Sequence, residues 1–224
     1  MYKRQIYPRY SHSVIIHNLD KNKTMTKLLI VRHGEASASW EESTDPGLSD
    51  LGIVQAEECA NMLIKLEGIE NYDLKSSPLK RAIETGTKLK EKLNKDLLID
   101  PVFTEIPSPG IPLNKRQQWL KEIFNKNINE LEKAQLNWHQ SIISKIKEFK
   151  NPTIIFSHFM VINTIVANAE NYRSMVSFYP DNCSVTEFDI NKKKIELVNL
   201  GTQLSTHINY CLLYTSPSPR DVVP

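Results

Sequence analysis

Three polar clusters, each directly after an apolar run, contain the residue types that phosphate chemistry uses. They are Arg32-His33-Gly34-Glu35, Ser76-Ser77-Pro78 with Arg81, and Ser157-His158. A histidine can act as a nucleophile or carry a proton near neutral pH, and a planar guanidinium matches the oxygens of a phosphate group. Two histidines and two arginines therefore predict a site for a phosphate-sized anion, and this site needs no metal ion.

The apolar runs before these clusters predict buried β-strands over residues 27–32, 72–76 and 152–156. The carboxyl ends of parallel strands meet at one edge of a sheet, where ligands bind. We therefore expect the three clusters to converge there. A helix predicted to begin at Ser77-Pro78 and to continue through Arg81 to about Asn94 adds its positive dipole end to the same region.

The remaining pattern alternates helices with strands. A helix capped by Ser49 or Asp50 shows apolar periodicity to Leu66, and Gly68 ends it. Further segments are a short strand at 97–99, a proline-rich loop at 104–114, helices at 114–126, 129–149 and 160–169, and strands at 184–190 and 194–200 joined by a hairpin through Asn191-Lys192. This order predicts a three-layer α/β/α sandwich with a mostly parallel central sheet and an antiparallel strand from the last hairpin.

The run Leu28-Leu-Ile-Val-Arg-His-Gly-Glu35 resembles the signature of the histidine phosphatase superfamily, which has the phosphoglycerate-mutase-like fold. The resemblance continues at Leu48-Ser-Asp-Leu-Gly52 with Gln55-Ala56, at Ser76-Ser-Pro-Leu-Lys-Arg-Ala82 with Thr85, and at Ser157-His158. It covers residues 26–200 in the expected order. The ordered set is specific, whereas Arg-His-Gly alone recurs by chance.

The resemblance implies a role for each residue. His33 would be the nucleophile that forms a phosphohistidine, and Arg32 and Arg81 would hold the non-bridging phosphate oxygens. His158, if protonated, would donate to the same phosphoryl group. Glu105 falls where the family places an acid/base carboxylate, which would protonate the leaving oxygen and then activate water.

Several positions depart from the mutases of this family. Ser39 stands where mutases commonly carry asparagine; it is a candidate phosphate contact, or a plain loop serine. Phe159-Met160-Val161 replaces the polar Gly-Asn-Ser that mutases tend to have after the second histidine. These departures favour a phosphatase over a mutase. The leading prediction is therefore a metal-independent phosphomonoesterase that needs no cofactor. The alternatives are a phosphoglycerate-type mutase, a phosphohistidine protein phosphatase and an inactive phospho-ligand binding module.

Other residues admit two interpretations. Glu35 is a second carboxylate beside His33, and we expect it to have a positioning role. The loop at 106–114 and the helix from Asn114 are expected to cover the site, which favours a phosphorylated small molecule as substrate. Lys115 and Arg116 there could meet a second anionic group, or be a solvated basic pair. Trp138 lies in a helical apolar pattern and is expected in the core.

The chain has 224 residues, of which 40% are hydrophobic and 24% are charged, an ordinary globular composition. The net charge of +2 argues against a nucleic-acid partner. No run approaches the roughly 18 apolar residues of a membrane span, and no secretory core is recognised, so a cytoplasmic protein is expected. The three cysteines, Cys59, Cys183 and Cys211, have the spacing of neither a disulfide framework nor a zinc site. The oligomeric state stays open.

Both ends resemble sequencing-adapter DNA translated into protein. The stretch from Cys211 to Asp221 back-translates into a transposase adapter, and Tyr2-Lys-Arg-Gln5 fits the opposite strand of the same adapter. We therefore expect residues 1–5 and 211–224 to be artefacts. Met25 is a natural start, which leaves residues 1–24 as a doubtful leader and predicts a single histidine phosphatase domain over residues 25–210.

Overall fold

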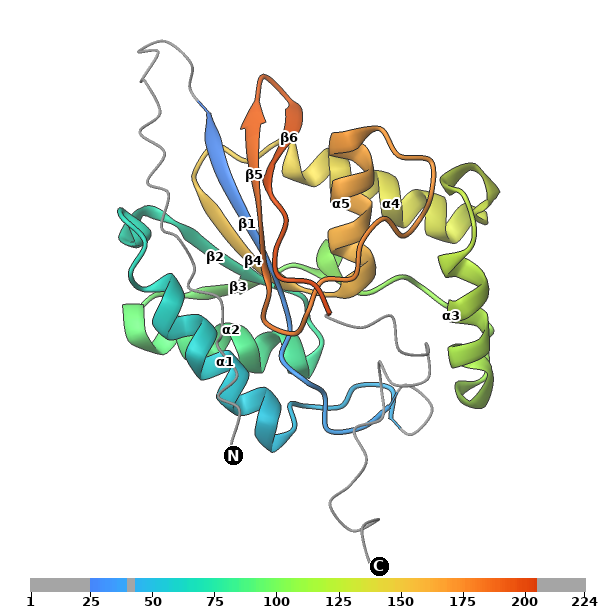
Figure 1. Ribbon diagram of the computed structural model, residues 1–224, viewed down its shortest axis with the longest axis horizontal. Coiled ribbons are helices and arrows are strands. Elements are labelled where there is room, and N and C mark those ends of the chain that lie inside the picture. The colour runs from blue at the N-terminus through green and yellow to red at the C-terminus, as the bar shows by residue number, and fades with distance from the viewer. Residues whose placement is uncertain (1–24, 40–42, 205–224) are drawn as a thin grey trace, which may run out of the picture.

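Six β-strands form one twisted sheet, and helices cover both of its faces (Figure 1). The computed structural model describes residues 25–39 and 43–204. The strands are β1 (Thr26–Arg32), β2 (Asp73–Ser76), β3 (Leu97–Ile99), β4 (Thr153–Ser157), β5 (Val185–Asn191) and β6 (Lys194–Asn199), in the order β3-β2-β4-β1-β5-β6. Strands β1 to β4 are parallel, and β5 and β6 add an antiparallel edge. The prediction of a mostly parallel sheet with an antiparallel final hairpin is confirmed.

The α-helices lie in two layers around the sheet. They are α1 (Asp50–Leu63), α2 (Lys80–Leu93), α3 (Arg116–Phe124), α4 (Lys133–Ile146) and α5 (Phe159–Glu170). Short 3₁₀ turns span Ile69–Asn71, Pro101–Phe103, Leu113–Lys115 and Ile128–Glu130. Alternate residues of β1 point to opposite faces: Leu28 and Ile30 pack in one hydrophobic cluster with α4 and α5, and Leu29 and Val31 pack in another with α1 and α2. The three-layer prediction is confirmed.

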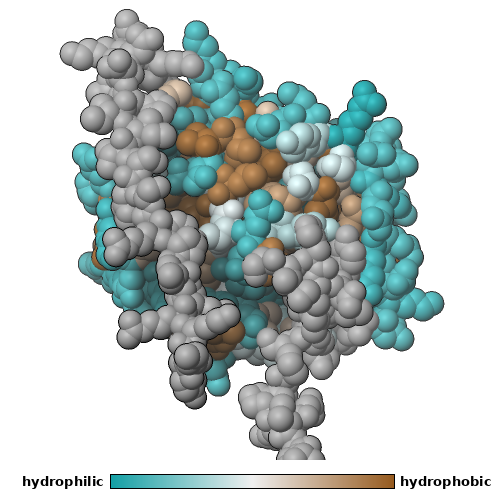
Figure 2. All heavy atoms as spheres, viewed as in Figure 1, coloured by the Kyte–Doolittle hydropathy of each residue, from teal (hydrophilic) through white to brown (hydrophobic). Residues whose placement is uncertain are grey.

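Apolar and polar residues separate on the surface as well. On the face shown in Figure 2, hydrophobic residues gather near the centre, over the strands, and hydrophilic residues line the side where α3 lies.

A third buried cluster, which contains Leu120, Phe159 and Met160, joins α3 to α5. The α3 region is therefore packed onto the start of α5, directly after His158.

Two helix boundaries show where the sequence pattern succeeds and where it fails. Helix α1 begins as predicted, because the backbone N–H of Gly52 donates to the Ser49 hydroxyl at 3.0 Å. The predicted start of α2 at Ser77-Pro78 is wrong, since the helix begins at Lys80. The N–H of Lys80 donates instead to Asp45 Oδ1 at 2.9 Å, so a side chain from a distant loop caps α2.

Other elements differ from the predictions by a few residues. Helix α1 ends at Leu63 rather than at Leu66, and Gly68 lies beyond it with a φ of 71°. The predicted helices at 114–126 and 129–149 are shorter, as α3 and α4, with 3₁₀ turns before them. The last hairpin turns at Lys192-Lys193, both with positive φ, one residue later than predicted.

No helix among the described residues is both long enough and apolar enough to cross a membrane. The expectations for residues 1–24 and 211–224, including the adapter-like ends, concern parts of the chain outside the described residues.

Candidate active site

His33 lies immediately after β1, where its backbone is hydrogen-bonded to the end of β4 and to the side chain of Asn182. Its N–H donates to the Ser157 carbonyl at 3.0 Å, and its carbonyl accepts from Asn182 Nδ2 at 3.0 Å. The ring Nδ1 lies 2.6 Å from the Gly34 carbonyl, which can only accept, so Nδ1 carries the proton. Arg81 Nε donates to the other ring nitrogen, Nε2, at 3.0 Å. His33 Nε2 is therefore an unprotonated nitrogen beside a guanidinium.

The electrostatic surroundings keep the His33 ring neutral. Burial is the largest cause, and the positive charges of Arg81 and Arg32 add to it; together they hold the pKa of His33 well below its usual range. Burial, followed by the charges of Arg81, His33 and Arg32, likewise holds the pKa of His158 well below its usual range. Both imidazoles are neutral in this state, which suits a nucleophile but not the protonated donor expected at His158.

Arg32 and Arg81 reach the site from different elements. Arg32 ends β1, is buried, donates from one terminal nitrogen to the Pro180 carbonyl at 2.8 Å, and lies 5.6 Å from the centre of the Phe159 ring. Arg81 comes from the first turn of α2 and is also buried. Thr85, one turn further along α2, accepts from the Gly34 N–H at 3.1 Å and donates to the Arg81 carbonyl at 2.7 Å. This threonine joins the His33 loop to the helix that carries Arg81.

His158 follows β4, the neighbour of β1, and lies at the start of α5. Its ring centre is 5.2 Å from that of His33, and its Nε2 is 2.6 Å from the Ser77 hydroxyl. Within the described chain, the buried His158 Nδ1 has no hydrogen-bond partner. Ser77 is thus engaged by His158, although the sequence suggested only a helix cap.

Glu105 is buried in the segment that follows the 3₁₀ turn at Pro101–Phe103. Its two carboxylate oxygens accept from the N–H of Ile106 at 2.9 Å and from the N–H of Met160 at 3.5 Å. Burial raises the pKa of Glu105, while these N–H groups and the charges of Arg81 and Arg32 oppose the rise. Glu105 therefore keeps its proton to a higher pH than an exposed glutamate, and it feels the same two arginines as His33.

The loop between β1 and α1 contains Glu35 and Ser39. Glu35 accepts from the Ser49 hydroxyl at 2.8 Å, and its N–H donates to Gln55 at 2.8 Å, so it anchors the loop to α1. A Cβ on Gly52 would lie 2.1 Å from the Glu35 carbonyl, so only glycine fits this contact. Ser39 is buried in the same loop, and its phosphate contact stays a prediction.

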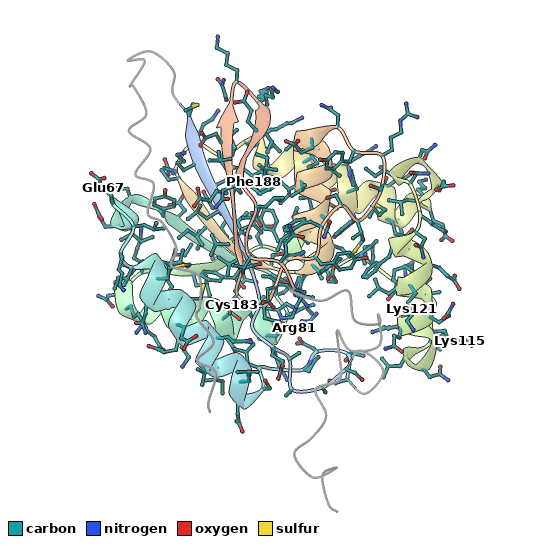
Figure 3. All side chains as sticks on the ribbon, viewed as in Figure 1. Glu67, Arg81, Lys115, Lys121, Cys183 and Phe188 are labelled. Carbon is teal, nitrogen blue, oxygen red and sulfur yellow. The ribbon has the colours of Figure 1, made fainter. Side chains whose placement is uncertain are left out.

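The basic residues of α3 lie apart from this group. Figure 3 shows Lys115, which directly precedes α3, and Lys121, on α3, well to the side of Arg81. Lys115 is exposed and Arg116 is partly buried. Across residues 25–39 and 43–204, no cluster of three or more His, Cys, Asp or Glu side chains is suited to bind a metal ion.

The structure therefore brings together five residues from four separate segments, namely Arg32, His33, Arg81, Glu105 and His158. Ser77, Thr85 and Asn182 contact them and were missed as site residues by the sequence analysis. Ser77 and Thr85 at least lie within the motifs that carry the resemblance, whereas Asn182 precedes β5 with no signal of its own.

Comparisons with known proteins agree with this arrangement. The model of the histidine phosphatase superfamily (branch 1) matches residues 28–203. The 2,3-bisphosphoglycerate-dependent phosphoglycerate mutase of Thermoplasma acidophilum is 32% identical over 83 residues, which cover 35% of this chain and 40% of that protein. The match thus spans less than half of that relative.

Solved structures share the fold at low identity. The phosphoserine phosphatase of Entamoeba histolytica, in complex with 3-phosphoglyceric acid, is 21% identical with a TM-score of 0.61, covering 80% of this chain and 98% of that chain. A mycobacterial glucosyl-3-phosphoglycerate phosphatase is 17% identical with a TM-score of 0.56, covering 78% of this chain and 96% of that chain.

Proposed function

The chain belongs to the histidine phosphatase superfamily (branch 1), and from this premise we propose that it hydrolyses a phosphomonoester through a phosphohistidine on His33. The observation that carries the proposal is the state of His33. Its Nδ1–H is fixed on the Gly34 carbonyl, and its Nε2 is unprotonated beside Arg81. A neutral imidazole whose unprotonated nitrogen is defined is what attack on phosphorus requires.

In the first step, His33 Nε2 attacks phosphorus, an N–P bond forms, and the P–O bond to the leaving alcohol breaks. Glu105, whose pKa is raised by burial, gives its proton to the leaving oxygen. Arg32 and Arg81 hold the non-bridging oxygens, where negative charge is spread during phosphoryl transfer. Arg81 Nε must turn from His33 Nε2 towards the phosphoryl group for this step.

In the second step, the Glu105 carboxylate takes a proton from water, and the resulting hydroxide attacks phosphorus. The N–P bond breaks, His33 returns to its neutral form, and inorganic phosphate leaves. His158 lies 5.2 Å from His33, centre to centre, and contributes a ring nitrogen to the same phosphoryl group. The negative charge of that group opposes the effect of the two arginines, so phosphate binding favours the protonated, donating form of His158.

We propose that the reaction is metal-independent and that the substrate is a phosphorylated small molecule. Two buried guanidinium groups at the nucleophile supply the positive charge that the transferring phosphoryl group needs. The relatives include proteins named as phosphatases of phosphoserine and of glucosyl-3-phosphoglycerate, which supports a small phosphorylated substrate.

The test is hydrolysis of an aryl phosphate, with EDTA present, by the protein and its His33→Ala variant. We expect chelator-resistant activity that falls by on the order of 10⁴-fold or more in the variant. Rapid acid-free quenching should trap a phosphoenzyme that is stable to base and labile to acid. Activity that survives in His33→Ala, with the same phosphoenzyme, would refute the assignment.

A phosphoglycerate-type mutase is the second candidate, because the curated relative with 32% identity carries that name. The two functions differ in how long the phosphoenzyme lasts. A phosphatase loses its phosphoryl group to water without a second substrate, whereas a mutase retains it until an acceptor alcohol binds. Decay of the isolated phosphoenzyme in buffer, with and without 3-phosphoglycerate, separates them.

A further inference from the structure

The segment that carries Glu105 has no helix or strand of its own between Thr104 and Pro112. Two backbone carbonyls of this segment, and that of Phe103 directly before it, accept hydrogen bonds from side chains of other elements. The Ser157 hydroxyl donates to the Phe103 carbonyl at 2.8 Å, Trp138 Nε1 donates to the Thr104 carbonyl at 2.8 Å, and Gln135 Nε2 donates to the Pro107 carbonyl at 3.0 Å.

Two of these three donors come from one face of α4. Gln135 and Trp138 are three residues apart, so their side chains project from the same side of the helix. Their bonds bracket Glu105, one at the residue before it and one two residues after it. The Trp138 bond holds the peptide plane on the N-terminal side of the Glu105 Cα, and the Gln135 bond anchors the chain two residues further on. Together they restrict the direction in which the Glu105 side chain leaves the backbone.

Packing alone does not explain why position 135 carries the amide side chain of a glutamine. Its side chain is 2% exposed, and burying an amide in an apolar region costs free energy unless the amide is hydrogen-bonded. A leucine or methionine would fill the same space without that cost. The amide is instead used for one bond to the Glu105 segment.

We propose that Gln135 and Trp138 are positioning residues that hold Glu105 in place for proton transfer to the leaving group. The inference rests on the proposed function, in which Glu105 is the general acid. Proton transfer needs the carboxyl within hydrogen-bond reach of the leaving oxygen, and a misplacement of about 1 Å can cost on the order of 100-fold in rate. Phosphate binding by Arg32, His33 and Arg81 does not depend on these bonds.

The dependence of the rate on the leaving group tests this role. An alkoxide needs a proton as it departs, whereas dinitrophenolate departs without one, so misplacing the acid slows only poor leaving groups. We would measure kcat/KM, which reports phosphoenzyme formation, for an alkyl phosphate, phenyl phosphate and 2,4-dinitrophenyl phosphate. The variants are Trp138→Phe and Gln135→Met, which remove one donor each and keep the apolar volume.

Each variant is expected to lose about 10- to 100-fold in kcat/KM with the alkyl phosphate and less than about threefold with the dinitrophenyl ester. Ile142→Val is the matched control, because Ile142 is a buried α4 residue that loses packing without losing a bond to the segment. It should show no dependence on the leaving group. Thermal unfolding of all three variants shows whether each is folded at the assay temperature, and the two donor variants test the role independently.

Equal losses with all three esters, or no loss with the alkyl phosphate, would overturn the positioning role. Failure of the proposed function gives a different result. In that case Glu105→Gln itself would show no dependence on the leaving group, or the wild-type protein would form no phosphoenzyme. An effect in Glu105→Gln without one in Gln135→Met and Trp138→Phe would leave the function standing and remove the inference alone.

Discussion

His33 and His158 follow the adjacent parallel strands β1 and β4, whereas Glu105 lies in a segment without regular structure. The His33 N–H bond to the Ser157 carbonyl ties the segment after β1 to the end of β4, directly before His158. Side chains from α4 and β4 hold the Glu105 segment. The proposed phosphate half of the site, which comprises Arg32, His33, Arg81 and His158, thus depends on the fold as a whole. The proposed acid half, which contains Glu105, depends on a few individual side chains.

The largest expected effect comes from substituting Glu105, and it should depend on the leaving group of the substrate. Glu105→Gln keeps the shape of the side chain and removes the transferable proton. We expect kcat/KM for an alkyl phosphate to fall by on the order of 10²–10⁴-fold, while kcat/KM for 2,4-dinitrophenyl phosphate stays within about tenfold. Steady-state kinetics with both esters checks this. A uniform loss with both would mean that the two halves are not separable.

A substitution in the phosphate half should instead lower kcat/KM by the same factor whatever the leaving group. Arg81→Lys keeps a positive charge but loses the planar group whose Nε contacts His33. We expect kcat/KM to fall by on the order of 10²–10³-fold with every ester alike, because charge on the phosphoryl oxygens develops with any leaving group. A loss confined to the alkyl ester would contradict this division.

The pH dependence of stability should also differ in sign between the halves. Burial first, then the nearby arginines, lower the pKa of His158, so the folded protein binds fewer protons there than the unfolded chain. As pH falls below about 6.5, the free energy of unfolding should decrease by up to about 1.4 kcal/mol per pH unit for each such histidine. His158→Asn should make this slope shallower in urea titrations between pH 7.5 and 5.5.

The Glu105 carboxyl has the opposite effect on the pH dependence of the free energy of unfolding. Burial raises its pKa, so the folded state binds the proton more tightly, and its contribution to stability is lost as pH rises through its unfolded value towards its raised value. Glu105→Gln should remove that loss. If His158→Asn and Glu105→Gln changed the pH slope in the same direction, the assigned pKa shifts would be wrong.

The smallest effect concerns the loop after His33. Ser49→Ala removes the helix cap of α1 and the bond to Glu35, at a cost of about 1 kcal/mol in the free energy of unfolding. Because backbone bonds hold His33 itself, kcat/KM should change by less than about threefold. Ser141→Ala, on an exposed part of α4, is the matched control and should change stability by less than about 0.5 kcal/mol.

The sequence allowed the phosphate half to be predicted because its signals are local. An apolar run that ends in Arg-His-Gly indicates a buried strand followed by functional residues, and parallel strands bring such ends together. Arg32, His33 and His158 therefore lie where the pattern predicts. Arg81 also lies there, although α2 begins two residues after its predicted start at Pro78.

The features that could not be predicted depend on contacts between distant residues. Asp45 caps α2 from 35 residues away, and Ser77 bonds His158 from 81 residues away. Trp138 was expected to be a core residue; it packs against the core but also donates to Thr104 across 34 residues. Spacing along the chain contains no information about such pairs, because they form only when the layers assemble.

The bond between Arg81 Nε and His33 Nε2 has a consequence for how ligands bind. In the resting protein the Nε2 lone pair is already occupied, so under the proposed function a phosphorylated ligand does not simply add to a prepared anion site. The ligand replaces His33 Nε2 as a partner of the Arg81 guanidinium. Its measured affinity therefore reflects the difference in free energy between these two interactions. The same exchange shields the imidazole from stray electrophiles until a ligand with enough negative charge draws the arginine away.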